Sequence, residues 1–183
     1  MIISNFHKQT IVCLVFICIL FINNAGAQAK PVSEKYGHTI NIGVGSGIGN
    51  YGYAFYKTPA VHIDYEIDII PTLTLAPFVL LYQFRNNAYH ERVIPVGLKA
   101  TCYFDQIVKA HPHWDFYLAG SLGYAIRKTV WENGFAPDPN TSYGPGALYL
   151  VLSIGSEYHI TKKLGAFIDL SNGISTIGLS IHH

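Results

Sequence analysis

Ser171 and Asp169 are the residues whose types and spacing come nearest to a hydrolytic site. They belong to the run Asp169-Leu170-Ser171-Asn172-Gly173, so both side chains lie on one face if the segment is a strand. A serine becomes a nucleophile when a neighbouring imidazole removes its proton, and an aspartate does not replace that imidazole. We therefore predict a polar pair leading into a hairpin. His159 or His182 can serve Ser171 only if the fold brings one of them to it.

The histidines are the second group whose chemistry could matter. His111-Pro112-His113 and His182-His183 are close in sequence, but neither pair has a cysteine or carboxylate partner at the spacing of metal ligands. We therefore predict no metal site and no cofactor.

The most regular stretch of the sequence is 61–69, V-H-I-D-Y-E-I-D-I, in which apolar and polar residues alternate strictly. Successive side chains of a strand point to opposite sides, so this alternation indicates a strand with one apolar and one polar face. The polar face holds His62, Asp64, Glu66 and Asp68. In a soluble protein that face meets water, whereas in a membrane barrel the apolar face meets lipid and the carboxylates fill the lumen. The orientation of this strand therefore decides the class of the protein.

The composition is that of one β-rich domain. The chain has 183 residues, 17 glycines and 14% aromatic residues, a mixture typical of short strands and tight turns. Lys and Arg together number 12 against 11 Asp and Glu, so nucleic acid is not expected as a partner.

Residues 1–27 are predicted to be a signal peptide that is removed on export. A lysine precedes the apolar run 11–22, and Ala25-Gly26-Ala27 offers small residues for cleavage. The run is short for a transmembrane helix, which needs roughly 20 residues. Residues 28–36 then form a polar leader, and residues 37–183 form the folded domain.

After the leader, the sequence predicts about eight strands separated by turn residues. Most are long enough to cross a bilayer when tilted, a span of roughly 9–11 residues, and the longer loops gather at one end. The segment 72–85 is apolar on both faces and carries Pro77, which weakens its strand pattern. The predicted bounds are 38–48, 58–69, 72–85, 92–104, 114–127, 147–159, 164–171 and 175–182.

The polar faces of these strands carry glycines among charged residues. An eight-stranded barrel has an interior just wide enough for side chains to fill, so we expect a plugged polar lumen and no aqueous channel. Each buried charge then needs a partner, because an unpaired buried charge is costly. The residues expected in this lumen network are His62, Asp64, Glu66, Lys99, Arg127, Glu157 and Asp169.

Several segments resemble a known family. Residues 93–104 (V-I-P-V-G-L-K-A-T-C-Y-F), 114–126 (W-D-F-Y-L-A-G-S-L-G-Y-A-I) and 158–170 (Y-H-I-T-K-K-L-G-A-F-I-D-L) are similar to strands of the small outer-membrane β-barrel proteins of Gram-negative bacteria. The resemblance implies an all-β, eight-stranded antiparallel up-and-down transmembrane β-barrel in the outer membrane, surrounded by outer-membrane lipid and inserted by the barrel-assembly machinery. One departure is the terminus: family members usually end on an aromatic residue, whereas this chain ends Ile181-His182-His183.

A second, local resemblance concerns Asp169-Leu170-Ser171-Asn172. It is similar to the H-x-S-N motif of lipid A deacylases, another family of eight-stranded outer-membrane barrels, but Asp169 stands at the histidine position. This resemblance implies a lipid A acyl hydrolase using Ser171, which is kept as an alternative.

The favoured function is non-catalytic. We expect a structural or binding role, through surface loops or as an accessory subunit of a larger outer-membrane complex. A soluble exported barrel that binds a ligand is the remaining alternative. Aromatic residues in the predicted loops are expected to bind partners: Tyr51, Tyr53, Phe55, Trp131 and Phe135.

Overall fold

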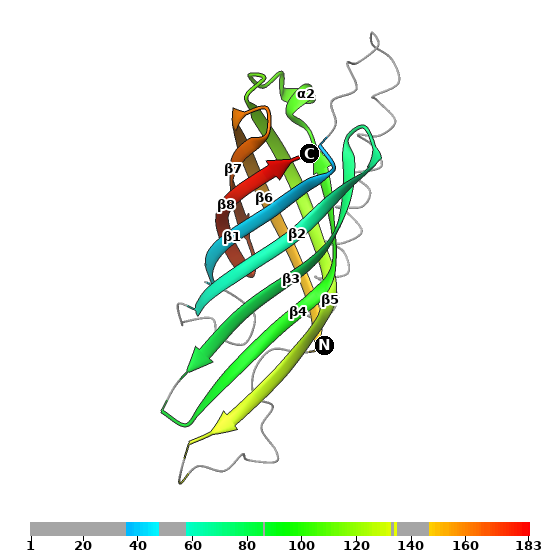
Figure 1. Ribbon diagram of the computed structural model, residues 1–183. Helices are drawn as coiled ribbons and strands as arrows, with labels where there is room; N and C mark the ends of the chain where they lie inside the picture. Colours follow the sequence, from blue (N-terminus) through cyan, green and yellow to red (C-terminus); the bar gives the residue numbers. More distant parts are fainter. Residues whose placement is uncertain (1–35, 48–57, 86, 133, 135–146) are drawn as a thin grey trace. The chain divides into compact units, whose positions relative to one another are not determined.

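The fold is a closed barrel of eight antiparallel strands in sequence order, seen in a computed structural model (Figure 1). The structure describes residues 36–47, 58–85, 87–132, 134 and 147–183, which lie in one compact unit. The predicted eight-stranded antiparallel fold is confirmed. The strands are β1 (Thr39–Gly47), β2 (Thr58–Ile70), β3 (Leu73–Arg85), β4 (Tyr89–Tyr103), β5 (Trp114–Trp131), β6 (Leu148–Thr161), β7 (Leu164–Ser171) and β8 (Ile174–His182).

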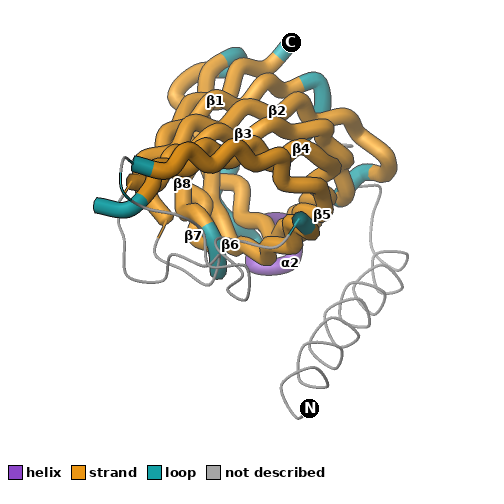
Figure 2. Tube along the Cα trace, turned by 90° about the horizontal axis from the view of Figure 1, so that it is seen from below, coloured by secondary structure: helices purple, strands orange, loops and turns teal. Residues whose placement is uncertain are grey.

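Closure comes from the pairing of the last strand with the first. β8 pairs with β1 from Thr39↔His182 to Gly47↔Ile174, so neither strand leaves an open edge there. Figure 2 shows the resulting ring of strands from one end.

The alternation of β2 places its apolar side chains outside the barrel and its carboxylates inside. Val61 and Ile63 are 46% and 43% exposed, whereas Asp64 and Glu66 are 2% and 3% exposed. This is the orientation expected for a barrel whose outer face meets lipid. It is the reverse of the arrangement in a soluble barrel, in which the apolar face would be buried.

The connections divide the barrel into two ends. We call the end with residues 71–72, 104–113 and 162–163 the turn end; β1 begins there and β8 ends there. The opposite end, with the connections after β1, β3, β5 and β7, is the loop end. The connection at the turn end between β4 and β5 contains the short helix α2 (Asp105–Val108), which the sequence reading did not predict.

The β4–β5 hairpin is longer than predicted. β4 begins at Tyr89 and β5 continues to Trp131, so part of each predicted loop is strand. The two strands stay paired over this extension, from Tyr89↔Trp131 onward, whereas β6 pairs with β5 only as far as Tyr124↔Leu148. The hairpin can extend beyond the other strands because β4 and β5 continue to form backbone hydrogen bonds with each other.

The interior is polar near the turn end and apolar near the loop end. A plugged polar lumen was expected throughout, and this is wrong for the loop-end half. The difference arises from β3, which is apolar on both faces and directs Phe78, Leu80, Tyr82 and Phe84 inward. The buried residues of this apolar cluster are Ala60, Phe78, Leu80, Tyr82, Phe84, Tyr89, Val93, Ala125, Tyr149 and Val151.

Several predictions concern residues outside the described ranges. The signal peptide (1–27) and all of the leader (28–36) except Tyr36 lie outside them, as do Tyr51, Tyr53, Phe55 and Phe135. Among the described residues, no helix has the length and apolar character needed to cross a membrane.

Candidate functional site

The centre of the polar interior is an ion group formed by strands β2 and β4. Lys99 Nζ lies 2.6 Å from Asp64 Oδ2 and 3.0 Å from Glu66 Oε1. The two carboxylates share one face of β2 because they are two residues apart, and Lys99 reaches them across β3. All three side chains are buried. In a region from which water is excluded, these side chains can stay ionised because the ammonium group pairs with the carboxylates.

Neutral donors satisfy the remaining carboxylate oxygens. Asn41 Nδ2 donates to Asp64 Oδ1 at 2.9 Å and to Glu66 Oε1 at 3.1 Å. Thr74 and Tyr103 each donate a hydroxyl hydrogen bond to Glu66 Oε2 at 2.7 Å. These donors come from β1, β3 and β4, so the network ties neighbouring strands of the wall together through the lumen.

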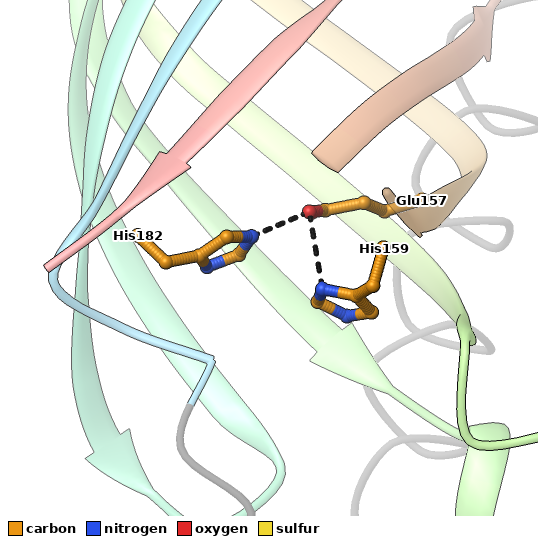
Figure 3. Close-up of side chains that lie close together, drawn as sticks. All are labelled: Glu157, His159 and His182. Carbon is orange, nitrogen blue, oxygen red and sulfur yellow. Dashed lines mark hydrogen bonds and ion pairs between the residues drawn. The ribbon is translucent and has the colours of Figure 1, made fainter. Parts of the chain in front are cut away.

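A second group lies at the turn end and joins β6 to β5 and β8. Glu157 Oε1 is 2.6 Å from His182 Nε2 and 3.8 Å from His159 Nδ1. Figure 3 shows both imidazole rings directed at the same carboxylate oxygen. His159 Nε2 lies 2.7 Å from Asp115 Oδ2 on the other side of its ring. We call Asp115, Glu157, His159 and His182 the turn-end cluster.

Local strand features position this cluster. Glu157 and His159 are two residues apart on β6, so both face the interior. A β-bulge between His159 and Thr161 changes the register with β7 just beyond His159, and bulges redirect the side chains beside them. Gly165 of β7 leaves room for the carboxylate, because a Cβ at this position would overlap Glu157 Oε1.

The predicted hydrolytic pair does not have the geometry of a nucleophile and its base. Asp169 and Ser171 line a cavity of about 30 Å³ in mid-barrel together with His62, which is room for roughly one water. Ser171 Oγ accepts a hydrogen bond from Gly173 N at 3.1 Å. Within the described part of the chain, no hydrogen bond joins Ser171 to a histidine, and His159 and His182 belong to the turn-end cluster. The arrangement lacks the imidazole contact that activates a serine.

Two further predicted site residues lie elsewhere than expected. Arg127 was placed in the lumen network, but its side chain is exposed on β5 beyond the last pair with β6. Trp131 was placed in a surface loop, but it belongs to β5 and packs against the apolar cluster, with its ring centroid 5.1 Å from that of Tyr89. Both differences follow from the length of the β4–β5 hairpin.

The other predicted network residues are all in the interior but in different groups. Asp64, Glu66 and Lys99 form the central group, with His62 Nε2 3.4 Å from Asp64 Oδ2, and Glu157 belongs to the turn-end cluster. Asn41, Tyr103, Asp115, His159 and His182 were not predicted as partners. Their inward parity on the strands is a signal that was available in the sequence, but which of them meet depends on the stagger of the closed barrel.

An apolar outer face around a closed interior packed with polar and apolar side chains defines the fold of small transmembrane β-barrels. No family model matches the chain, and no curated protein matches its sequence. Among solved structures it is similar to Neisserial surface protein A (14% identity, TM-score 0.51, covering 79% of this chain and 95% of that chain). It is also similar to Ail, the attachment invasion locus protein of Yersinia pestis (10% identity, TM-score 0.51, covering 80% and 99%). The predicted resemblance to small outer-membrane barrels is thereby confirmed for the fold.

Proposed function

We propose that the protein is a non-catalytic β-barrel of the bacterial outer membrane that acts as a structural or binding component of the cell envelope. The observation that carries the proposal is the inversion of β2, with Ile63 outside and Asp64 buried, since an apolar exterior of this kind suits lipid. The similarity to Ail, an outer membrane protein, supports the location.

A binding role is favoured over a channel or an enzyme by the filled interior. Lys99, Asp64 and Glu66 occupy the centre, and the apolar cluster lies in the loop-end half. Among the described residues this is the side-chain-filled interior typical of eight strands, whereas an aqueous channel is typical of barrels with many more strands. Binding then falls to the loop end, where the longest connection of the barrel leaves β5 and a connection of ten residues leaves β1. The similarity to a surface protein and an attachment protein supports that choice.

Location and fold are tested by expressing the full chain in a Gram-negative host and separating the membranes. We expect the protein in the outer-membrane fraction, with a gel mobility that changes on boiling because the barrel stays closed in detergent until heated. Recovery of the folded chain from the aqueous fraction without detergent would contradict the location and favour the soluble alternative.

The binding role is tested by pull-down from detergent-solubilised outer membrane. A variant with Tyr51, Tyr53 and Phe55 replaced by serine is the matched control for the wild-type chain. We expect outer-membrane proteins or lipid to co-purify with the wild type and to be depleted from the variant, while heat-modifiable mobility is kept. Equal recovery from both chains would contradict a role for this loop.

The hydrolase alternative is tested by lipid A mass spectrometry. We expect identical lipid A profiles from cells that carry the wild-type chain, Ser171→Ala or an empty vector. A loss of acyl chains that depends on Ser171 would show that the barrel is an enzyme.

A further inference from the structure

We propose that Glu157, His159 and His182 form a binding site for one divalent transition-metal ion at the turn end of the barrel, with Zn²⁺ as the ion that fits best. One ligand atom from each residue lies within 4.8 Å of the others. The site does not depend on what the loop end binds, so it can be tested independently of the proposed function.

The distances suit a tetrahedral ion after a small movement. Bonds of about 2.0–2.2 Å in tetrahedral geometry place ligand atoms roughly 3.4 Å apart. Glu157 Oε1 is 2.6 Å from His182 Nε2, closer than this, and 3.8 Å from His159 Nδ1, slightly farther. A movement of the two imidazole rings that lengthens the first distance and shortens the second would therefore open the position that an ion needs. Figure 3 shows that one nitrogen of each imidazole ring faces the same Glu157 carboxylate oxygen.

The hydrogen bonds of His182 direct its Nε2 to the ion. Thr39 Oγ1 donates its proton to the carbonyl oxygen of Tyr36 at 2.9 Å. It must therefore accept from His182 Nδ1, which lies 2.9 Å away, and this fixes the proton on Nδ1. Nε2 then faces Glu157 Oε1 at 2.6 Å. A cation bound between these two atoms would have both of them as ligands, an imidazole nitrogen and a carboxylate oxygen.

His159 is oriented in the same way by a carboxylate. Its Nε2 lies 2.7 Å from Asp115 Oδ2, so Nε2 donates and Nδ1 faces Glu157. A carboxylate that holds the distal nitrogen of a histidine is the usual support of a metal-bound imidazole. Asp115 is buried, which keeps this support fixed, and it acts as a positioning residue without binding the ion itself.

The donor set and exposure favour zinc with one open position. Two imidazoles and one carboxylate match the three-ligand sets that bind Zn²⁺ and leave a fourth position for water, whereas Ca²⁺ and Mg²⁺ prefer sites made of oxygen atoms. The side chains of His159 and His182 are 25% and 16% exposed, while that of Glu157 is 6% exposed. An ion can thus reach the histidines from solvent at the turn end and meet a largely buried carboxylate.

The test is calorimetric titration of Zn²⁺ into the untagged full chain, extracted in detergent from the outer membrane and freed of metal with a chelator. We expect one ion per chain and at least a tenfold loss of affinity in His159→Gln, in His182→Gln and in Glu157→Gln. Asp115→Asn removes no ligand and should weaken binding by about 10–100-fold. Heat-modifiable mobility reports whether each variant is folded. If His182→Gln is not folded, His182→Asn takes its place.

Other histidines near the turn end provide the matched control. His111 and His113 stack on each other with ring centroids 5.2 Å apart, and they are exposed. The double variant His111→Gln/His113→Gln and the single variant His183→Gln should bind Zn²⁺ like the wild type. Two results would overturn the proposal: unchanged Zn²⁺ affinity in folded His159→Gln and His182→Gln, or loss of binding in the His111/His113 variant instead.

Discussion

Lys99 Nζ and Asp64 Oδ2 lie 2.6 Å apart inside the barrel, and the same ammonium group is 3.0 Å from Glu66 Oε1. One lysine therefore faces two buried carboxylates. Neutral donors from Asn41, Thr74 and Tyr103 complete the hydrogen bonding. The central group is thus held by one positive charge and a set of fixed dipoles. Lys99 supplies that positive charge, which the neutral donors cannot supply.

We predict that Lys99→Met destabilises the folded barrel by about 3–5 kcal/mol, because it leaves two buried carboxylates without their cation. The measurement is urea unfolding of the protein in lipid vesicles. Lys162→Met, in the exposed turn between β6 and β7, is the control and should change the free energy of unfolding by no more than about 0.5 kcal/mol. Equal effects of the two substitutions would show that the central ion group does not hold the barrel together.

The outer face gives a prediction about depth in the bilayer. Ile63 lies in the middle of β2, and Val130 lies in the part of β5 that extends beyond β6; both are exposed. Ile63→Lys should lower the free energy of unfolding in vesicles by about 2–4 kcal/mol, and Val130→Lys by about 0–1 kcal/mol, because a charge is costly only near the bilayer midplane. Similar, small effects at both positions would contradict a lipid-facing surface.

The apolar half of the interior gives a matched pair on β3. Leu80 is 2% exposed inside the barrel, and its neighbour Leu81 is 38% exposed on the outer face. Leu80→Ala should cost about 2–5 kcal/mol because it leaves a cavity. Leu81→Ala should cost clearly less, since lipid can fill the space. The free energies of unfolding of the two variants, measured side by side, check this difference. A larger loss in Leu81→Ala would contradict a packed core inside the barrel.

The strand faces were predictable because the side-chain period of a strand is two. His62, Asp64 and Glu66 alternate with Val61 and Ile63, and that pattern alone fixed which side of β2 is polar. The inner face of β3 could not be separated from its outer face in this way, since both are apolar. The apolar half of the lumen was missed for that reason.

The turn-end cluster could not be predicted from the same pattern. Asp115, Glu157 and His182 each have the inward parity of their strand, but they lie on three different strands. Which inward residues share a level depends on the stagger at which the barrel closes, including the pairing of β8 with β1. The bulge beside His159 is a further shift that alternation does not show.

Gly165 offers a test of the turn-end cluster that changes none of its members. A Cβ at this position would overlap Glu157 Oε1 and lie 2.7 Å from Glu157 Cδ, so the carboxylate must move in Gly165→Ala. The contact is with the far end of a side chain, and we therefore expect the barrel to fold while Zn²⁺ affinity falls about tenfold or more. Gly120→Ala is the matched control, because its added Cβ would meet only Leu152 Cδ2 at 3.5 Å, and it should bind Zn²⁺ like the wild type. Calorimetric titration of both variants checks the difference. Wild-type affinity in folded Gly165→Ala would mean that the present position of the Glu157 carboxylate does not matter for the ion.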